Sequence, residues 1–423
     1  MAPRKMSLER PHGPTSRWPW GLLPTFHRDP LTLLERVGRR YPSMAALPFG
    51  PWTLYLATGD KAVADVLRTH KDHFRKGPGM EAKNPLIGQG MLLSEGDLWR
   101  EQRRAIMPVF SHNAIKAYHA AIAHEVNVGA QKFFSAASVD AGVFGRYLAL
   151  AVTLSTLFGL SPKDELISRL GESTSQVMEH FHHRARSLYR PPYAWPKAFN
   201  GAFHQSSDVL RAFVEPLLDR PNTPLLEILA QSPPDRRAQE ALTFLIAGHE
   251  TTGNALAWTI RLLADHPEVV ERVSQEAEGG LVYSEAVVLE SLRLFPPVWL
   301  LSRTAIQNVE VDHYHLAAGS QFLVSPWVTH RLESYYPEAE SFLPERWLDG
   351  GEIKRTRTDY RFLAFGGGPR RCPGEEFALA ELSLAVANIC RRWRLRSREP
   401  FPSPTPGMTL SPRGGLEILA CPR

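Results

Sequence analysis

Cysteine is scarce in this chain of 423 residues, which contains only Cys372, Cys390 and Cys421. Their wide spacing excludes a disulfide framework and a cysteine-based zinc site. Long apolar runs are also lacking, because no stretch approaches the roughly 20 residues that a membrane-spanning helix needs. Residues 1–30 are polar and proline-rich and have no apolar core of signal-peptide length. We therefore expect a cytoplasmic protein without a transmembrane anchor.

The sequence also lacks a flexible linker, an internal repeat or any break in composition. We therefore expect one large domain over residues 1–423, although a typical domain has roughly 100–200 residues. The net charge of +5 is modest, and no basic tract is interleaved with aromatic residues. This composition argues against nucleic acid as a partner. The arginines form clusters that can pair with acidic groups of a cofactor or of a partner protein.

One stretch does stand out, the glycine- and arginine-rich segment 365–374, with the sequence FGGGPRRCPG. Glycine allows backbone to approach a flat or bulky group closely and to take positive φ. The cysteine precedes a helix-compatible apolar run, where a helix N-terminus favours thiolate over thiol. A thiolate beside arginines indicates an anchored metal cofactor with acidic groups, and such a thiolate is a known axial ligand of haem iron. The alternative is an inert, buried cysteine after a glycine-rich turn.

A second unusual stretch interrupts the longest helical pattern of the chain, expected over residues 237–264. Its first half is almost continuously apolar, as in a helix through the centre of a protein. Gly248, Glu250, Thr251 and Thr252 then bring a glycine, a carboxylate and two hydroxyls to the middle of the helix. Gly248 can leave room for dioxygen, and Glu250 with Thr251 can relay protons. The alternative is a polar stripe along a surface groove.

Two pairs of side chains have helical spacing. Trp99 and Arg103 are four residues apart, so their N–H groups share a helix face and can reach one carboxylate. Glu290 and Arg293 form an acid–base pair three residues apart. The alternatives are a core tryptophan beside a surface arginine, and an ordinary exposed ion pair.

Together these motifs resemble those of the cytochrome P-450 superfamily, the haem-thiolate monooxygenases, and they occur in the family's order. The resemblance implies a mainly α, triangular fold with a small β region. It also implies haem b between the central long helix and the cysteine loop, with Cys372 as the iron ligand. Glu250 and Thr251 are then the catalytic pair, and Glu290, Arg293 and Arg346 a structural network. The implied haem contacts are Lys76, Trp99, Arg103, Ala247, Gly248, Arg303, Phe365, Gly366, Arg370 and Gly374.

A finer resemblance concerns the substrate. Residues 297–303, expected as a strand, and residues 322–331 resemble segments of short bacterial carotenoid-ring hydroxylases. The implied substrate is a carotenoid whose β-ionone ring is hydroxylated, with Ile87, Thr252, Trp299 and Leu300 lining the pocket. A fatty acid or a terpenoid is the alternative substrate. We expect a monomer that makes transient contact with a membrane surface to collect this lipophilic substrate.

The source of electrons follows from what is missing. The chain contains no fused flavin or iron–sulfur domain, so a ferredoxin with its reductase is the expected donor. A haem-thiolate peroxygenase or isomerase would need no reductase, but the Glu250-Thr251 pair argues against a peroxygenase. A non-enzymatic haem sensor is the third class, and the absence of an output domain argues against it.

Overall fold

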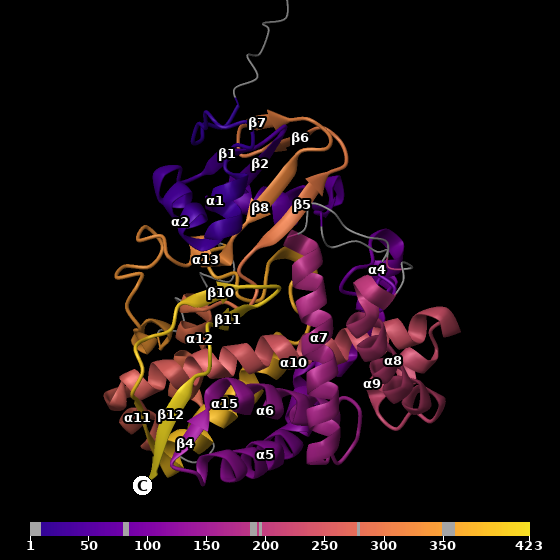
Figure 1. The fold of residues 1–423 in the computed structure, drawn as a ribbon, viewed down its shortest axis with the longest axis vertical. Helices are drawn as coiled ribbons and strands as arrows, with labels where there is room; N and C mark the ends of the chain where they lie inside the picture. Colours follow the sequence, from indigo (N-terminus) through magenta and orange to yellow (C-terminus); the bar gives the residue numbers. More distant parts are fainter. Residues whose placement is uncertain (1–9, 79–83, 187–192, 194–196, 277–279, 349–359) are drawn as a thin grey trace, which may run out of the picture. The chain divides into compact units, whose positions relative to one another are not determined.

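The computed structural model describes residues 10–78, 84–186, 193, 197–276, 280–348 and 360–423. The chain folds into two compact units, each assembled from distant segments of the sequence. The first unit comprises residues 1–80, 298–341 and 350–372, and the second comprises residues 81–297, 342–349 and 373–423. Helices predominate and the sheets are small (Figure 1), which confirms the predicted mainly α fold. A single domain over residues 1–423 stays a prediction.

The first unit is built on a five-stranded sheet in the order β1-β2-β8-β5-β3. β2 and β8 run parallel, and the other neighbours run antiparallel. The fully buried ring of Phe322 packs against Tyr55 and Phe74, which gives the sheet an aromatic core. The strands are β1 (Met44–Phe49), β2 (Trp52–Ala57), β3 (Phe74–Lys76), β5 (Leu301–Ala305) and β8 (Gln321–Val324).

β5 begins at Leu301, later than the strand that the sequence predicts over residues 297–303. The reason is local, because the carbonyl of Trp299 accepts a hydrogen bond from the Ser325 side chain, at 2.8 Å, instead of joining the ladder. Short elements surround the sheet. They are α1 (Leu23–Arg28), α2 (Pro30–Arg40), α3 (Asp60–Ala64) with the π turn Asp65–Thr69, the hairpin β6 (Val309–Val311) and β7 (Tyr314–Leu316), and α13 (Pro326–Thr329).

The second unit is organised around α10 (Pro234–Asp265), a 32-residue helix that contains the predicted central helix. α6 (Ala141–Thr156) packs along it (Figure 1). Small residues allow this close crossing, since a Cβ atom added to Gly145 would lie 2.3 Å from the carbonyl oxygen of Gly253. The crossing fixes α10 against α6 near the middle of α10, where the unusual polar residues lie.

The other helices of the second unit surround this pair. They are α4 (Gly96–Ile106), α5 (His112–Phe134), α7 (Asp164–Arg186), α8 (Lys197–Asp219), α9 (Pro224–Ala230), α11 (Pro267–Ser274), α12 (Val282–Leu294) and α15 (Glu375–Arg392). Two small sheets complete the unit. One has the order β4-β12-β9, formed by Ser138–Asp140, Glu417–Pro422 and Trp393–Ser397, and the other pairs β10 (Pro404–Pro406) with β11 (Leu410–Pro412). Cys390 is fully buried in α15.

Candidate active site

The cysteine loop of the first unit takes a backbone conformation that favours glycine. Gly366 and Gly368 have φ angles of 73° and 66°, in the left-handed region that disfavours other residues. A Cβ atom on Gly368 would also lie 2.0 Å from the carbonyl oxygen of Leu67. The amide of Cys372 donates a 2.9 Å hydrogen bond to the carbonyl of Phe365, which closes the loop. The loop thereby holds the thiol of Cys372 at an exposed position.

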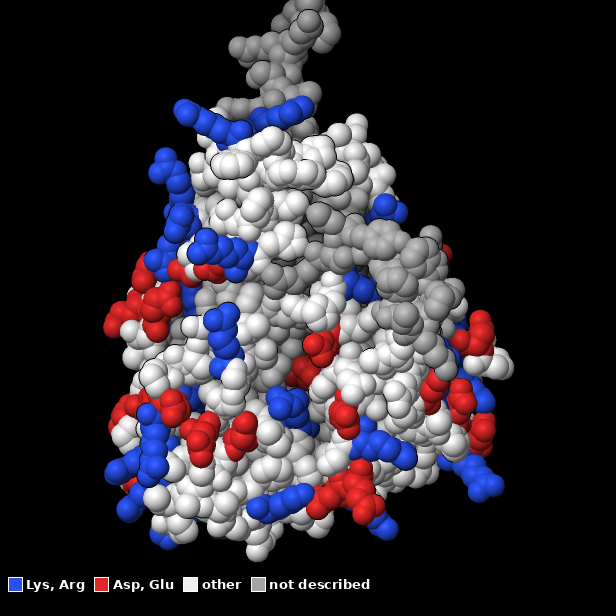
Figure 2. Space-filling model, viewed as in Figure 1, with Lys and Arg blue, Asp and Glu red and all other residues white. Residues whose placement is uncertain are grey.

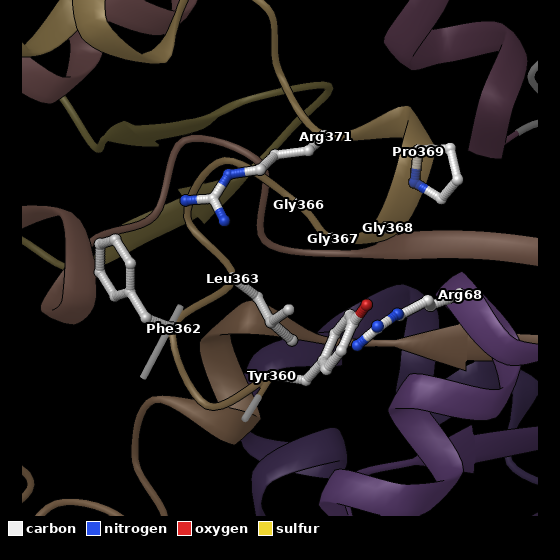
Figure 3. A pocket seen from close by; sticks show the side chains of 9 residues that line it. All are labelled: Arg68, Tyr360, Phe362, Leu363, Gly366, Gly367, Gly368, Pro369 and Arg371. Carbon is white, nitrogen blue, oxygen red and sulfur yellow. The ribbon is translucent and has the colours of Figure 1, made fainter. Parts of the chain in front are cut away.

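A cavity of about 300 Å³ opens beside this loop within the first unit. Figure 3 shows the glycine run 366–368 along one side of it, with Arg68 and Tyr360 side by side and Arg371 extending into the same space. The Arg68 guanidinium hydrogen-bonds the Tyr360 phenol, whose pKa is nevertheless raised, chiefly by burial. Two guanidinium groups and the backbone of the glycine loop therefore line a hollow that suits an anion.

A second pair of cations lies on the sheet of the first unit. Lys76 in β3 and Arg303 in β5 are directly opposite each other in the antiparallel register, and both are half-buried. Like charges at opposed positions of a sheet destabilise it. A carboxylate bound beside them would offset this repulsion, which is what the predicted contact with haem propionates requires. Arg370, the other predicted propionate contact of this unit, lies in the 3₁₀ turn Gly368–Arg370 and is half-buried.

In the second unit, the middle of α10 has one side that no other part of its unit buries completely. From Glu240 to Ala264 every residue is buried except Ala247, Gly248, Glu250 and Thr251. Ala247 is exposed, and Thr251, one turn further on, lies on the same face. An uncovered face on an otherwise buried helix is available for contact with a cofactor or a substrate.

The hydroxyl on this face and the neighbouring glycine have defined contacts. Thr251 donates its hydroxyl proton to the carbonyl of Ala247 at 2.6 Å, the back-bond that loosens a helix locally. A Cβ atom on Gly248 would lie 2.6 Å from the hydroxyl oxygen of Thr153 in α6. The glycine is therefore required by the packing of α6 against α10. Its predicted role of leaving room for dioxygen stays a prediction.

Glu250 is linked to several elements of the second unit. Its carboxylate accepts hydrogen bonds from Asn254 at 3.4 Å and from Thr409 at 3.3 Å, and Ser175 also donates to it. Burial raises the pKa of Glu250, whereas the Arg146 charge and these donors act in the opposite direction. Glu250 is thus a carboxyl that holds its proton to higher pH than an exposed glutamate does, as a proton-relay residue requires.

The predicted propionate-binding pair of the second unit lies on one face of α4. Trp99 and Arg103 are both half-buried, while their neighbours Arg100 and Arg104 are exposed. Arg100 instead pairs with Asp97 at 2.8 Å on the outer side of the helix. The helix therefore separates an inward-facing pair of donors from its solvent-facing charges.

The structure brings the predicted Glu-Arg-Arg network together. Glu290 and Arg293 are completely buried and form two hydrogen bonds of 2.8 Å. Arg346, from the turn Pro344–Trp347, donates to the same carboxylate at 3.0 Å. The Trp347 indole and the Leu343 amide also donate to it, at 2.7 and 3.0 Å. These last two donors were not predicted, because Trp347 and Leu343 lie more than 50 residues after Glu290 and no sequence motif links them to it.

The predicted pocket residues divide between the units. Trp299 is buried and Leu300 half-buried in the segment just before β5 in the first unit. Ile87 and Thr252, in the second unit, are both buried. Gly374 caps the N-terminus of α15, which begins at Glu375. Their roles in binding a substrate or a cofactor stay predictions.

Sequence reasoning overlooked two residues beside these sites. His249 is buried, its Nδ1 atom has no hydrogen-bond partner among the described residues, and burial lowers its pKa to about 3. It is therefore a neutral core imidazole next to Glu250. Arg68 lies about 300 residues before the cysteine loop, so only the folded chain shows that it faces the hollow.

The residues present fit a haem. Within the first unit there are an exposed thiol in a glycine loop and opposed cations that can pair with propionates, and within the second there is an uncovered helix face with a hydroxyl and a protonatable carboxyl. A thiolate ligand and cationic partners for carboxylates are what this cofactor needs.

The comparisons with known proteins agree with this fit. The family model described as cytochrome P-450 matches residues 11–225 and 231–419. The cyclooctat-9-en-7-ol 5-monooxygenase of Streptomyces melanosporofaciens is 30% identical and covers 90% of this chain and 87% of its own length. The chloroplastic protein LUTEIN DEFICIENT 5 of Arabidopsis thaliana is 27% identical over 90% of this chain and 72% of its own.

A solved structure shows the same likeness in three dimensions. The crystal structure of CYP175A1 from Thermus thermophilus superposes with a TM-score of 0.84 at 28% identity, and the match covers 97% of this chain and 99% of that one. Among the described helices, none is both long and apolar enough to cross a bilayer.

Proposed function

The chain belongs to the cytochrome P-450 family, and from this premise we propose that it hydroxylates the β-ionone ring of a carotenoid. Members of this family are haem-thiolate monooxygenases, oxidoreductases that use dioxygen and an electron-transfer partner on apolar substrates. The observation that carries the proposal is the uncovered face of α10, which presents Ala247 and Thr251, with the protonatable Glu250 next to Thr251 in the sequence. Such a face combines an apolar contact surface with a proton donor.

The proposed ligands of the haem, of type b, are distributed over the chain as follows. In the first unit, Cys372 supplies the thiolate, and Lys76, Arg303 and Arg370 supply cations for propionates. In the second unit, Trp99 and Arg103 supply two further donors from α4. Phe365, Gly366 and Gly374 shape the thiolate loop. When bound, a thiolate-ligated haem would supply the activation of dioxygen: with two electrons from the external donor and two protons, one oxygen atom would enter the substrate and the other would leave as water.

The role of the chain's own residues in catalysis is to hold and transfer protons. Because the Thr251 hydroxyl proton is committed to the carbonyl of Ala247, its oxygen is left to accept a hydrogen bond from a water or a substrate. Burial raises the pKa of Glu250, so its carboxyl takes up a proton more readily than that of an exposed glutamate does. The hydrogen bonds from Asn254 and Thr409 keep its carboxyl in one orientation.

The carotenoid assignment is supported by the first unit and by one relative. The two segments that resemble carotenoid-ring hydroxylases lie side by side, since β5 pairs with β8 through Leu301 opposite Val324. Ser325 further fixes the backbone of Trp299. The name of the Arabidopsis relative refers to lutein, a carotenoid. An apolar wall of Trp299 and Leu300 suits a long hydrocarbon.

The test is a binding spectrum of the purified ferric haem protein titrated with β-carotene and, separately, with a long-chain fatty acid. We expect β-carotene to change the haem spectrum and to yield a ring-hydroxylated product when ferredoxin, its reductase and dioxygen are supplied. A spectral change with fatty acid alone would refute the carotenoid assignment and leave the monooxygenase assignment intact. Product formed only with hydrogen peroxide would indicate a peroxygenase.

We also propose that a ferredoxin is the electron donor and that it places a carboxylate in the hollow lined by Arg68 and Arg371. The support is the convergence of two guanidinium groups and the glycine loop next to Cys372. Ferredoxins that carry acidic surfaces are complementary to such a site, and this complementarity accelerates association at low salt.

Two variants test this partner site. In Arg68→Gln and Arg371→Gln we expect reduction of the haem by reduced ferredoxin to slow about tenfold at low ionic strength. Reduction by dithionite should stay unchanged, because a small reductant needs no docking site. Arg75→Gln is the matched control, since Arg75 is an exposed arginine of the same unit outside the hollow. If the three variants slow reduction equally, the hollow is not the docking site.

A further inference from the structure

Three tryptophans of the first unit are exposed to a degree unusual for this residue. Trp18 is 77% exposed, and Trp20 and Trp52 are each 57% exposed. Every other described tryptophan is buried or half-buried. Large aromatic side chains on a surface represent a substantial apolar area in contact with water. We call these three residues the tryptophan patch.

The fold holds the tryptophan patch together. The turn 18–22 lies against the tip of the β1–β2 hairpin, where the Leu22 amide donates to the carbonyl of Pro48 at 2.7 Å. Gly21 permits this contact, because it has a φ of 61° and a Cβ atom there would lie 2.1 Å from the same carbonyl. A Cβ atom on Gly50, at the hairpin tip, would be 3.8 Å from the Trp20 ring. Trp52 follows directly as the first residue of β2.

The surroundings of the tryptophan patch are apolar and basic. Pro19 and Pro51 are exposed next to the tryptophans in the sequence, Arg17 is exposed directly before Trp18, and Arg28 is exposed at the end of α1. Residues 10–57 contain six arginines and only two carboxylates. One of these carboxylates, Glu35, is already paired with Arg39 at 2.7 Å. Around the labels α1, β1 and β2 (Figure 1), Figure 2 shows blue side chains at the margin of a broad white surface.

We propose that the tryptophan patch binds the interface of an anionic phospholipid bilayer. Tryptophan prefers the level of the lipid headgroups, where its ring is partly buried and its N–H remains hydrated. Arginines at the rim are attracted to a negative membrane surface. The occupant is a bilayer rather than a protein, because the patch combines protruding rings with a basic rim instead of forming a groove. The chain reaches the membrane through this surface, and none of the helices in the described residues is long and apolar enough to span a bilayer.

The binding itself does not depend on the proposed substrate, but its benefit rests on the proposed function. A carotenoid resides in lipid, so an enzyme held at the headgroup level meets its substrate without an aqueous step. A failure of carotenoid hydroxylation would leave the membrane contact standing, and a failure of membrane contact would leave hydroxylation standing.

The test measures partition of the full-length haem protein onto vesicles of phosphatidylcholine with about 30% phosphatidylglycerol. The variant carries Trp18→Ser, Trp20→Ser and Trp52→Ser. We expect its partition coefficient to fall at least about tenfold. The control carries Met107→Ser, Val282→Ser and Ile306→Ser, three exposed apolar residues outside the patch, and should bind as the wild type does.

Two further measurements separate the components of binding. Arg17→Gln with Arg28→Gln should weaken binding to the anionic vesicles and leave binding to pure phosphatidylcholine unchanged. Brominated lipid should quench tryptophan fluorescence in the wild type and not in the triple tryptophan variant. If the triple variant folds poorly, Trp18→Ser alone, in the most exposed of the three positions, makes the same comparison with a smaller expected loss.

Two results would overturn the proposal. One is a triple tryptophan variant that partitions onto vesicles as the wild type does. The other is a wild type that sediments as a dimer while the triple variant sediments as a monomer, because the patch would then be an interface between two copies of the chain.

Discussion

The buried carboxylate of Glu290 gives the sharpest stability prediction. Glu290 and Arg293 have no solvent exposure, and the carboxylate accepts five hydrogen bonds from Arg293, Arg346, Trp347 and the Leu343 amide. The substitution Glu290→Leu removes the acceptor but leaves the Arg293 guanidinium in place. A buried charge then has no counter-charge from this carboxylate, and the indole N–H of Trp347 loses its acceptor.

The expected loss can be estimated from these contacts. Breaking a buried ion pair by removing one partner costs about 3–5 kcal/mol, because the remaining charge stays desolvated. Glu345→Leu is the control, since Glu345 pairs with Arg272 at 2.6 Å while both side chains are about half exposed. An exposed pair of this kind contributes about 0–1 kcal/mol. The two substitutions remove chemically identical side chains from neighbouring networks, so they differ mainly in burial.

The assay is urea unfolding of the haem protein followed by circular dichroism. We expect a fall of about 3–5 kcal/mol in the free energy of unfolding for Glu290→Leu and at most about 1 kcal/mol for Glu345→Leu. The double variant Glu290→Leu/Arg293→Leu should recover part of the loss, because it removes the fully buried guanidinium of Arg293, although that of Arg346 remains. Equal effects of the two single substitutions, or a double variant less stable than Glu290→Leu, would refute the reasoning.

Three further predictions concern the candidate site. Cys372→Ser should abolish the red-shifted carbon monoxide band of the reduced haem protein, and a retained band would exclude this cysteine as the ligand. Burial raises the pKa of Glu250, so the free energy of unfolding should fall as the pH rises from the ordinary pKa of 4.5 through the raised pKa. Urea titrations at a series of pH values should show a smaller pH dependence for Glu250→Gln than for the wild type. An unchanged pH dependence would contradict this prediction. Gly368→Ala should lower the free energy of unfolding more than Gly319→Ala does. Both glycines have positive φ, so backbone strain alone predicts a loss of about 1–2 kcal/mol for Gly319→Ala, but only a Cβ atom on Gly368 would meet a carbonyl oxygen, at 2.0 Å. Equal losses in urea unfolding would exclude that clash.

Much of the site could be predicted because its signals are local in sequence. A helical period places Trp99 and Arg103 on one face of α4, and three-residue spacing places Glu290 beside Arg293. The same reasoning located α10, whose bounds Pro234–Asp265 extend only a few residues beyond the predicted range. The predicted start of β5, by contrast, was wrong, because the carbonyl of Trp299 accepts a hydrogen bond from the Ser325 side chain.

The sequence by itself determined the mainly α fold, the family motifs and the candidate thiolate. The reason is that hydrophobic periodicity, glycine content and short residue spacings are local properties of the sequence. Only the tertiary structure decided which distant residues meet: Arg68 beside the cysteine loop, Lys76 opposite Arg303, and Thr409 on Glu250. The physical reason is that these contacts depend on strand register and helix crossing, which the packing of the whole chain sets. Local propensity does not encode a neighbour that lies hundreds of residues away.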